Sequence, residues 1–136
     1  GEPPVASGLV DGSISGNGYS CTWSATTSAE PPQTLVIDSA TVNPPGGDAG
    51  CTTGMVPGFI LHSDATATFD DGSGTVTIDR LDISVETDVG ACRYEANGIV
   101  LGRDGSSRGY FGQWAFSLAS GAGCSTDDLH LLMTFS

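Results

Sequence analysis

Alternating apolar and polar residues mark the last third of the chain. The apolar members are Tyr110, Gly112, Trp114, Phe116 and Leu118 in one stretch, and Leu129, Leu131, Met133 and Phe135 in the next. A period of two with aromatic and branched side chains is typical of β-strands that have one buried face. The sequence therefore predicts strands over residues 110–118 and 129–135.

The same alternation recurs upstream, over residues 19–25, 35–42, 65–69, 76–85 and 92–96. Within 76–85 the apolar phase changes near Asp79-Arg80, which predicts a β-bulge or a corner at which a strand changes sheet. Asn97-Gly98 is a strong signal for a two-residue hairpin turn. Asp70-Asp71-Gly72-Ser73-Gly74 also predicts a hairpin turn, because Asp and Gly tolerate left-handed backbone geometry.

This pattern predicts a single all-β domain. No window has a sustained helical period, and 20 glycines and 7 prolines favour turns. About ten short strands indicate an antiparallel β-sandwich, with a barrel as the second architecture. Residues 1–18 are expected to form an extended N-terminal arm or an edge strand. Residues 19–136 then form the β-sandwich domain, with two weakly repeated halves over 19–89 and 90–136.

Charge narrows the set of partners. Sixteen acidic residues face four arginines and no lysine, which gives a formal net charge of −12. Such a field repels phosphate groups, so we expect no nucleic-acid partner. The chain also lacks a run of about eighteen apolar residues, so no transmembrane segment is predicted.

Four cysteines without a Cys-x-x-Cys pair argue against a redox motif or a zinc ribbon. They predict two structural disulfides, and therefore an extracellular or cell-envelope location. Four cysteines permit three connectivities.

A weak internal repeat favours one of them. Residues 18–23 are similar to 89–94, and residues 49–53 are similar to 122–126. If the halves are structural repeats, each cysteine pair closes within its own half. This predicts Cys21–Cys51 and Cys92–Cys124.

The cysteine-containing segments 20–26, 49–51, 92–96 and 120–124, followed by a final apolar strand, resemble those of small secreted or surface-anchored proteins of actinobacteria. The resemblance extends from Cys21 to the C-terminus and consists of cysteine spacing and composition. It implies an exported β-rich domain with two disulfides, and it carries over no catalytic or binding residues.

Catalysis is not predicted. A serine hydrolase with a nucleophile elbow requires Gly-x-Ser-x-Gly on a strand-to-helix turn, and the sequence predicts no such turn. His62 and His130 are interpreted as surface histidines. Glu86 and Glu95 are the glutamates of the strand region, and they are the candidate pair for a small acidic-residue hydrolase. That hydrolase is the third functional hypothesis.

Binding residues have two candidate positions. Asp70 and Asp71 gather hard oxygen ligands in one turn, so calcium is the one metal considered, and no other cofactor is expected. Tyr110 and Phe111 are adjacent aromatics on opposite strand faces, so one of them should be exposed on a binding surface.

Three functions follow from these features. The leading hypothesis is a non-catalytic structural or interaction protein that self-assembles by β-strand addition through its N-terminal arm. The alternative is a carbohydrate- or calcium-binding module that uses the loops near Asp70-Asp71 and residues 102–109. The hydrolase is the third.

Overall fold

The computed structural model describes residues 4–42, 50–51, 58–87, 90–103, 105, 108–125 and 129–135. Within these residues the chain forms eleven strands and one 3-10 helix, so the prediction of an all-β domain is confirmed. The elements are β1 (Val5–Ile14), β2 (Asn17–Thr26), β3 (Leu35–Ile37), η1 (Ser39–Thr41), β4 (Gly50–Cys51), β5 (Phe59–Leu61), β6 (Ala65–Asp70), β7 (Thr75–Thr87), β8 (Gly90–Arg103), β9 (Gly109–Trp114), β10 (Ser117–Ser120) and β11 (Leu129–Phe135).

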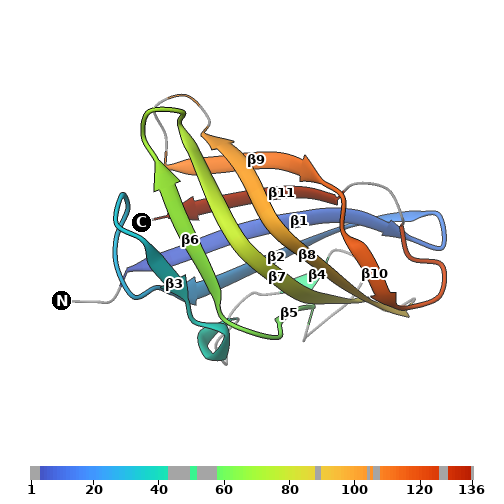
Figure 1. Cartoon of the computed structure of the whole chain (residues 1–136). Helices are drawn as coiled ribbons and strands as arrows, with labels where there is room; N and C mark the ends of the chain where they lie inside the picture. Colours follow the sequence, from blue (N-terminus) through green and yellow to red (C-terminus); the bar gives the residue numbers. More distant parts are fainter. Residues whose placement is uncertain are drawn as a thin grey trace.

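The strands form one curled antiparallel sheet, a half-barrel (Figure 1). Its order is β3-β6-β7-β8-β9-β11-β1-β2-β4, with β10 added to β8 and β5 added to β7. The curl brings distant parts of this order together, because Ser28 N donates to Val36 O (3.0 Å) and Asp38 N donates to Thr26 O (3.0 Å). These bonds join the end of β2 to β3. In Figure 1, β7 and β8 cross the front diagonally, and β1, β2 and β11 cross behind them.

Strand β1 lies in the interior of the sheet. It pairs with β11 on one side and with β2 on the other, from Val5↔Thr26 to Ile14↔Asn17. The expectation of a free arm or an edge strand over residues 1–18 is therefore wrong for the described part, while residues 1–3 lie outside it. The glycines of β1 hold it in the sheet, because Gly8 and Gly12 leave room for the large aromatic side chains Trp23 and Tyr19 of β2.

Strands β7 and β8 form a long hairpin that turns a corner. Apolar side chains face the interior from Val76 and Ile78, and then from Leu81, Ile83 and Val85, so the predicted phase change at Asp79-Arg80 is present. On β8 the phase changes opposite this point, at Asn97-Gly98, where Gly98 has φ 60°.

The predicted hairpin turn at Asn97-Gly98 is wrong, because β8 continues through it and stays paired with β7 on both sides. The positive φ of Gly98 changes which set of alternate side chains on β8 points inward, but it does not reverse the chain. The reversal falls between Thr87 and Gly90. Since the two strands pair along this whole length, the two proposed sequence halves share one sheet.

Both predicted disulfides are confirmed. Cys21–Cys51 joins β2 to β4, and Cys92–Cys124 joins β8 to the segment before β11. All four cysteines are buried. Each pair thus closes within its own half of the sequence, as the weak repeat predicted.

Candidate functional site

The interior of the half-barrel is filled with side chains. Trp23 stacks on Phe59 with ring centroids 5.8 Å apart, and aliphatic side chains from β7 and β11 surround them. The remaining cavity has a volume of about 10 Å³. This is room for about one water molecule, so a ligand must bind elsewhere.

The outer face of β9, β11 and β1 carries a row of apolar side chains. Strand register places Phe111 beside Leu132, and Leu132 beside Leu9. Phe111 is 55% exposed and Leu132 is 38% exposed, which are large values for apolar side chains in a sheet. This apolar row crosses three strands whose sequence positions are far apart.

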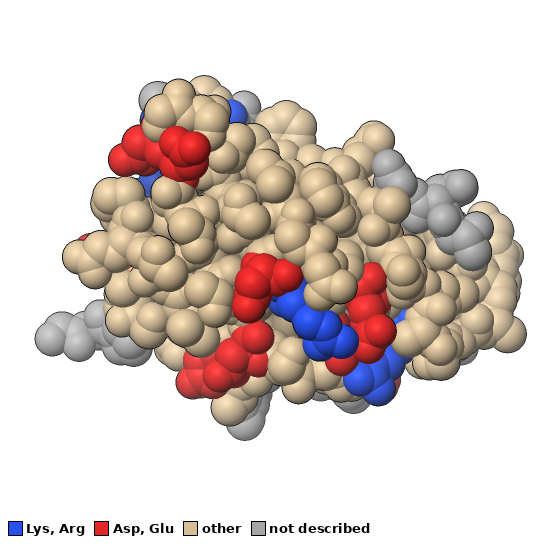
Figure 2. All heavy atoms as spheres, viewed as in Figure 1, with Lys and Arg blue, Asp and Glu red and all other residues tan. Residues whose placement is uncertain are grey.

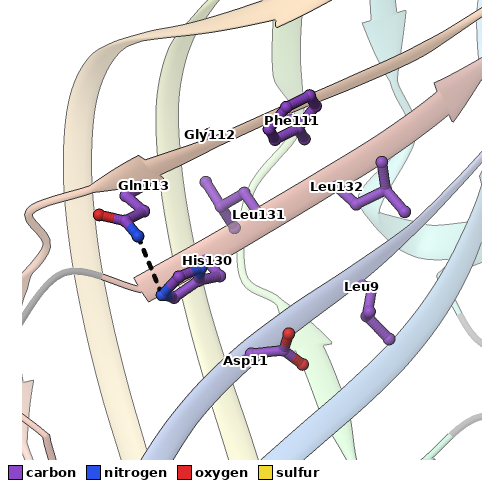
Figure 3. A pocket seen from close by; sticks show the side chains of 8 residues that line it. All are labelled: Leu9, Asp11, Phe111, Gly112, Gln113, His130, Leu131 and Leu132. Atoms are coloured by element: carbon purple, nitrogen blue, oxygen red, sulfur yellow. Dashed lines mark hydrogen bonds between the residues drawn. The ribbon is translucent and has the colours of Figure 1, made fainter. Parts of the chain in front are cut away.

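A polar row lies next to the apolar row. The same register places Gln113 beside His130, and His130 beside Asp11. Gln113 Nε2 lies 3.3 Å from His130 Nε2, so the side-chain amide and the imidazole hold each other in position (Figure 3). Asp11 points toward the same space from β1.

Together the two rows line an open groove of about 710 Å³, which we call the outer groove (Figure 3). This volume is in the range of small-molecule binding sites. One row offers apolar contact, and the other offers hydrogen-bond donors and acceptors. Such an arrangement suits a ligand that has one apolar face and one polar edge.

The structure separates the two predicted binding residues. Phe111 points outward into the outer groove, whereas Tyr110 is 5% exposed and packs on Phe69 and Phe135, with ring centroids 5.7 and 6.0 Å away. The groove residues that sequence reasoning missed are Leu9, Asp11, Gln113, His130 and Leu132. Each occupies an outward position of an alternating strand, but the register that joins them is not visible in the sequence.

Of the two predicted calcium ligands, Asp70 has a structural role in its turn. Asp70 Oδ1 accepts hydrogen bonds from Gly72 N (3.0 Å) and Ser73 N (3.2 Å), which hold the β6–β7 turn. The nearby Asp64, which precedes β6, accepts hydrogen bonds from Ser39 N and Ser39 Oγ. In the part of the chain that the structure describes, no group of three or more His, Cys, Asp or Glu side chains is placed to hold a metal ion.

The glutamate pair considered for hydrolysis does not assemble. Glu95 is the register partner of Asp82, and Glu86 is the partner of Ala91. The two glutamates therefore lie four positions apart along the β7–β8 ladder. At about 3.3 Å per residue this is about 13 Å. Glycosidase carboxylates lie about 5–9.5 Å apart, so this pair does not fit the mechanism. Glu95 also accepts a hydrogen bond from Arg80 Nη2 (3.0 Å).

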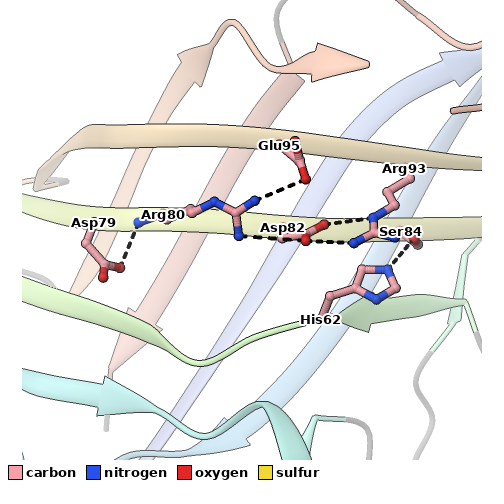
Figure 4. Close-up of polar contacts among 7 residues, drawn as sticks. All are labelled: His62, Asp79, Arg80, Asp82, Ser84, Arg93 and Glu95. Carbon is pink, nitrogen blue, oxygen red and sulfur yellow. Dashed lines mark hydrogen bonds and ion pairs between the residues drawn. The ribbon is translucent and has the colours of Figure 1, made fainter. Parts of the chain in front are cut away.

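A polar cluster lies on the outer face of β7 and β8 (Figure 4). The Asp82 side chain is 7% exposed and accepts two bonds from Arg93, Nε to Oδ1 at 3.0 Å and Nη2 to Oδ2 at 2.8 Å. Arg80 Nη1 lies 3.7 Å from Asp82 Oδ2. Figure 2 shows arginine and acidic side chains gathered in one patch on the lower part of the face, with a second charged patch at its upper left. The cluster neutralises a carboxylate that the fold covers.

His62 and Ser84 form a close pair beside this cluster. His62 Nε2 lies 2.6 Å from Ser84 Oγ, and Ser84 is buried (Figure 4). A serine nucleophile needs a hollow in which a substrate carbonyl can reach it. Neither residue lines the interior cavity, the outer groove or the hollow beside Arg103 and Arg108. The hydrogen bond satisfies the hydroxyl of the buried Ser84 on β7.

The Asp82–Arg93 pair predicts acid sensitivity. The hydrogen bonds from Arg93 hold the pKa of the Asp82 carboxyl below its usual range. A carboxyl with a lowered folded-state pKa stabilises the fold above its unfolded pKa of about 3.9, and this contribution is lost as the pH falls through the folded pKa. At pH 7, Asp82→Asn should lower the free energy of unfolding by about 2 kcal/mol.

Urea unfolding of wild type and Asp82→Asn from pH 7 down to pH 2 would measure this effect. The difference between them should shrink below about pH 4. Asp71→Asn, at an exposed turn position, is the matched control and should change stability by less than about 0.5 kcal/mol. A difference that is constant with pH would show that the Asp82 carboxylate charge does not stabilise the fold.

Comparison of the chain with protein-family models, with curated proteins and with solved structures finds no match. Among the described residues there is no helix of the length and apolar character needed to cross a membrane.

Proposed function

We propose that this protein is a non-catalytic, exported binding module that holds a neutral carbohydrate in the outer groove. The observation that carries the proposal is the pair of rows, apolar and polar, that lie side by side on one sheet face. The two disulfides support export, because disulfides persist in oxidising compartments.

The chemistry of a sugar ring matches both rows. A pyranose has an apolar face of C–H groups and an edge of hydroxyl groups. The exposed ring of Phe111, with Leu132 and Leu9 beside it, offers a surface on which the C–H face can pack. His130, Gln113 and Asp11 then lie where ring hydroxyls can exchange hydrogen bonds with them.

Charge favours a neutral ligand. No arginine lines the groove, and Asp11 is the one carboxylate among its lining residues. The chain as a whole carries −12, so an anionic polymer would be repelled. The groove is also open to solvent, which suits an oligosaccharide better than a small molecule that must be enclosed.

Phe111→Ala is expected to weaken oligosaccharide binding at least tenfold without changing the melting temperature by more than a few degrees. The reason is that Phe111 offers its exposed ring to the ligand, while its neighbour Tyr110 supplies the core contacts. Isothermal titration calorimetry with neutral gluco-, xylo-, manno- and chito-oligosaccharides measures the affinity.

Val36→Ala is the matched control, since Val36 is an exposed apolar residue on β3 outside the groove. It should bind like wild type. If wild type binds none of the panel at millimolar concentrations, or if Val36→Ala and Phe111→Ala weaken binding equally, the outer groove is not a carbohydrate site.

A protein partner, including a second copy of this chain, is the second candidate for the same face. Val100 on the outer face of β8 is 41% exposed and lies two residues from Gly102, the register partner of Phe111, so it enlarges the apolar surface. Self-assembly by strand addition through β1 is not supported, because β1 already pairs with a strand on each side and has no free edge. Light scattering of wild type and Leu132→Asp distinguishes this candidate: a wild-type dimer that the charge abolishes would favour it over carbohydrate.

A further inference from the structure

A second hollow, of about 250 Å³, lies where the β6–β7 turn meets the end of β8 and the start of β9. Arg103 N donates to Gly74 O (2.8 Å), which ties the end of β8 to that turn. Arg103, the last residue of β8, and Arg108, just before β9, line the hollow. Figure 2 shows acidic and basic side chains side by side at the end of the molecule where β6 and β7 join. We call this site the arginine hollow.

The distribution of the four arginines singles out this hollow. Arg80 and Arg93 are neutralised by Asp82 and Glu95. In contrast, neither Arg103 nor Arg108 forms an ion pair with any residue in the described ranges. Arg103 Nε donates to Gly105 O (3.4 Å), a bond that orients the guanidinium, and no residue in the described ranges accepts a hydrogen bond from its two Nη groups. Half of the positive charge of a strongly acidic chain therefore lies at one small site.

Apart from Asp71, the rest of the lining is a wall of aromatic and proline side chains. Phe69 and Tyr110 contact each other with ring centroids 5.7 Å apart, and both pack on Phe135. Pro31 and Pro32 complete this wall. A flat ring can pack on such a surface, and its substituent would then lie within reach of the guanidinium groups.

We propose that the arginine hollow binds a small organic anion in which a carboxylate is attached to a single ring. Guanidinium groups bind carboxylates through paired N–H···O bonds, which neutral donors do not match in strength. The volume is below the usual range for drug-sized ligands, which limits the ligand to about one ring. Asp71 also lines the hollow, and its carboxylate opposes the bound anion.

This site shares no lining residue with the outer groove. The proposal therefore stands or falls independently of the carbohydrate proposal. Phe111→Ala should leave it unchanged.

The test is a titration of the whole chain with benzoate at low ionic strength, followed by amide NMR shifts. Wild type should bind with a dissociation constant at or below the millimolar range, with shifts confined to residues near Arg103 and Tyr110. Arg108→Gln and Arg103→Gln should each weaken binding about tenfold. Asp71→Asn should tighten it about twofold or more, because it removes the opposing charge.

Arg80→Gln is the matched control, since it changes the net charge equally but lies in the Asp82 cluster. It should alter benzoate binding less than twofold. Benzyl alcohol and inorganic phosphate separate the two parts of the recognition, and both should bind at least tenfold more weakly than benzoate.

Three results would overturn the proposal. One is the absence of benzoate binding at concentrations up to about 10 mM. Another is an equal loss in Arg80→Gln, which would indicate a general charge effect. The third is phosphate binding as tight as benzoate binding, which would show that the apolar wall does not select the ligand.

Discussion

Replacing Cys92 and Cys124 together with alanine is expected to lower the free energy of unfolding by about 4 kcal/mol. The disulfide closes a loop with a sequence separation of 32 residues, and the chain-entropy model assigns about this value to a loop of that length. Without the bond the unfolded chain gains conformational freedom, while the folded state keeps most of its contacts. For a domain whose total stability is about 5–15 kcal/mol, this is a large share.

Urea unfolding without reductant would measure the loss, and the Cys21→Ala/Cys51→Ala pair is its control. That bond has a separation of 30 residues, so the model predicts nearly the same loss. A loss below about 1 kcal/mol for either pair would contradict the entropic account. Removal of both disulfides should leave little or no folded protein at 37 °C.

Gly8→Ala is expected to destabilise the fold by about 3 kcal/mol, a large effect for the addition of one methyl group. Gly8 pairs with Trp23 across β1 and β2, and a Cβ atom at Gly8 would overlap the indole ring of Trp23. The indole cannot easily withdraw, because it is buried and stacked on Phe59. The substitution therefore forces a shift in the packed interior.

Gly102→Ala is the matched control, because a Cβ atom there would meet nothing within 4 Å. It should change stability by less than about 0.5 kcal/mol. In a Trp23→Leu background, Gly8→Ala should cost much less, since the overlapping ring is gone. An equal cost in both backgrounds would contradict the steric explanation. Thermal or urea unfolding of wild type, the three single variants and the Gly8→Ala/Trp23→Leu double variant provides the measurement.

These two predictions depend on different kinds of information. The disulfides could be predicted from the sequence, because the repeated segments around Cys21 and Cys92 favoured pairing within each half. The role of Gly8 could not be predicted. Its neighbour Trp23 lies fifteen residues away along a hairpin whose register decides which side chain covers which glycine.

The candidate site divides in the same way. Tyr110 and Phe111 are sequence neighbours, and alternation alone requires them to face opposite sides of a strand. Which one faces outward depends on the position of the core. The structure places Phe111 outside, and it supplies the partners that make a groove, from His130 in β11 and Asp11 in β1.

The sequence by itself determined the all-β class, the alternating strands and the covalent frame, because these depend on local periodicity and cysteine spacing. Tertiary structure alone decided that β1 is an interior strand, that Asn97-Gly98 bends β8 without reversing it, and that Leu9, Leu132 and Phe111 form one row. The physical reason is register. Pairing between strands that are distant in sequence depends on how the whole interior packs, so a local sequence pattern does not predict the register.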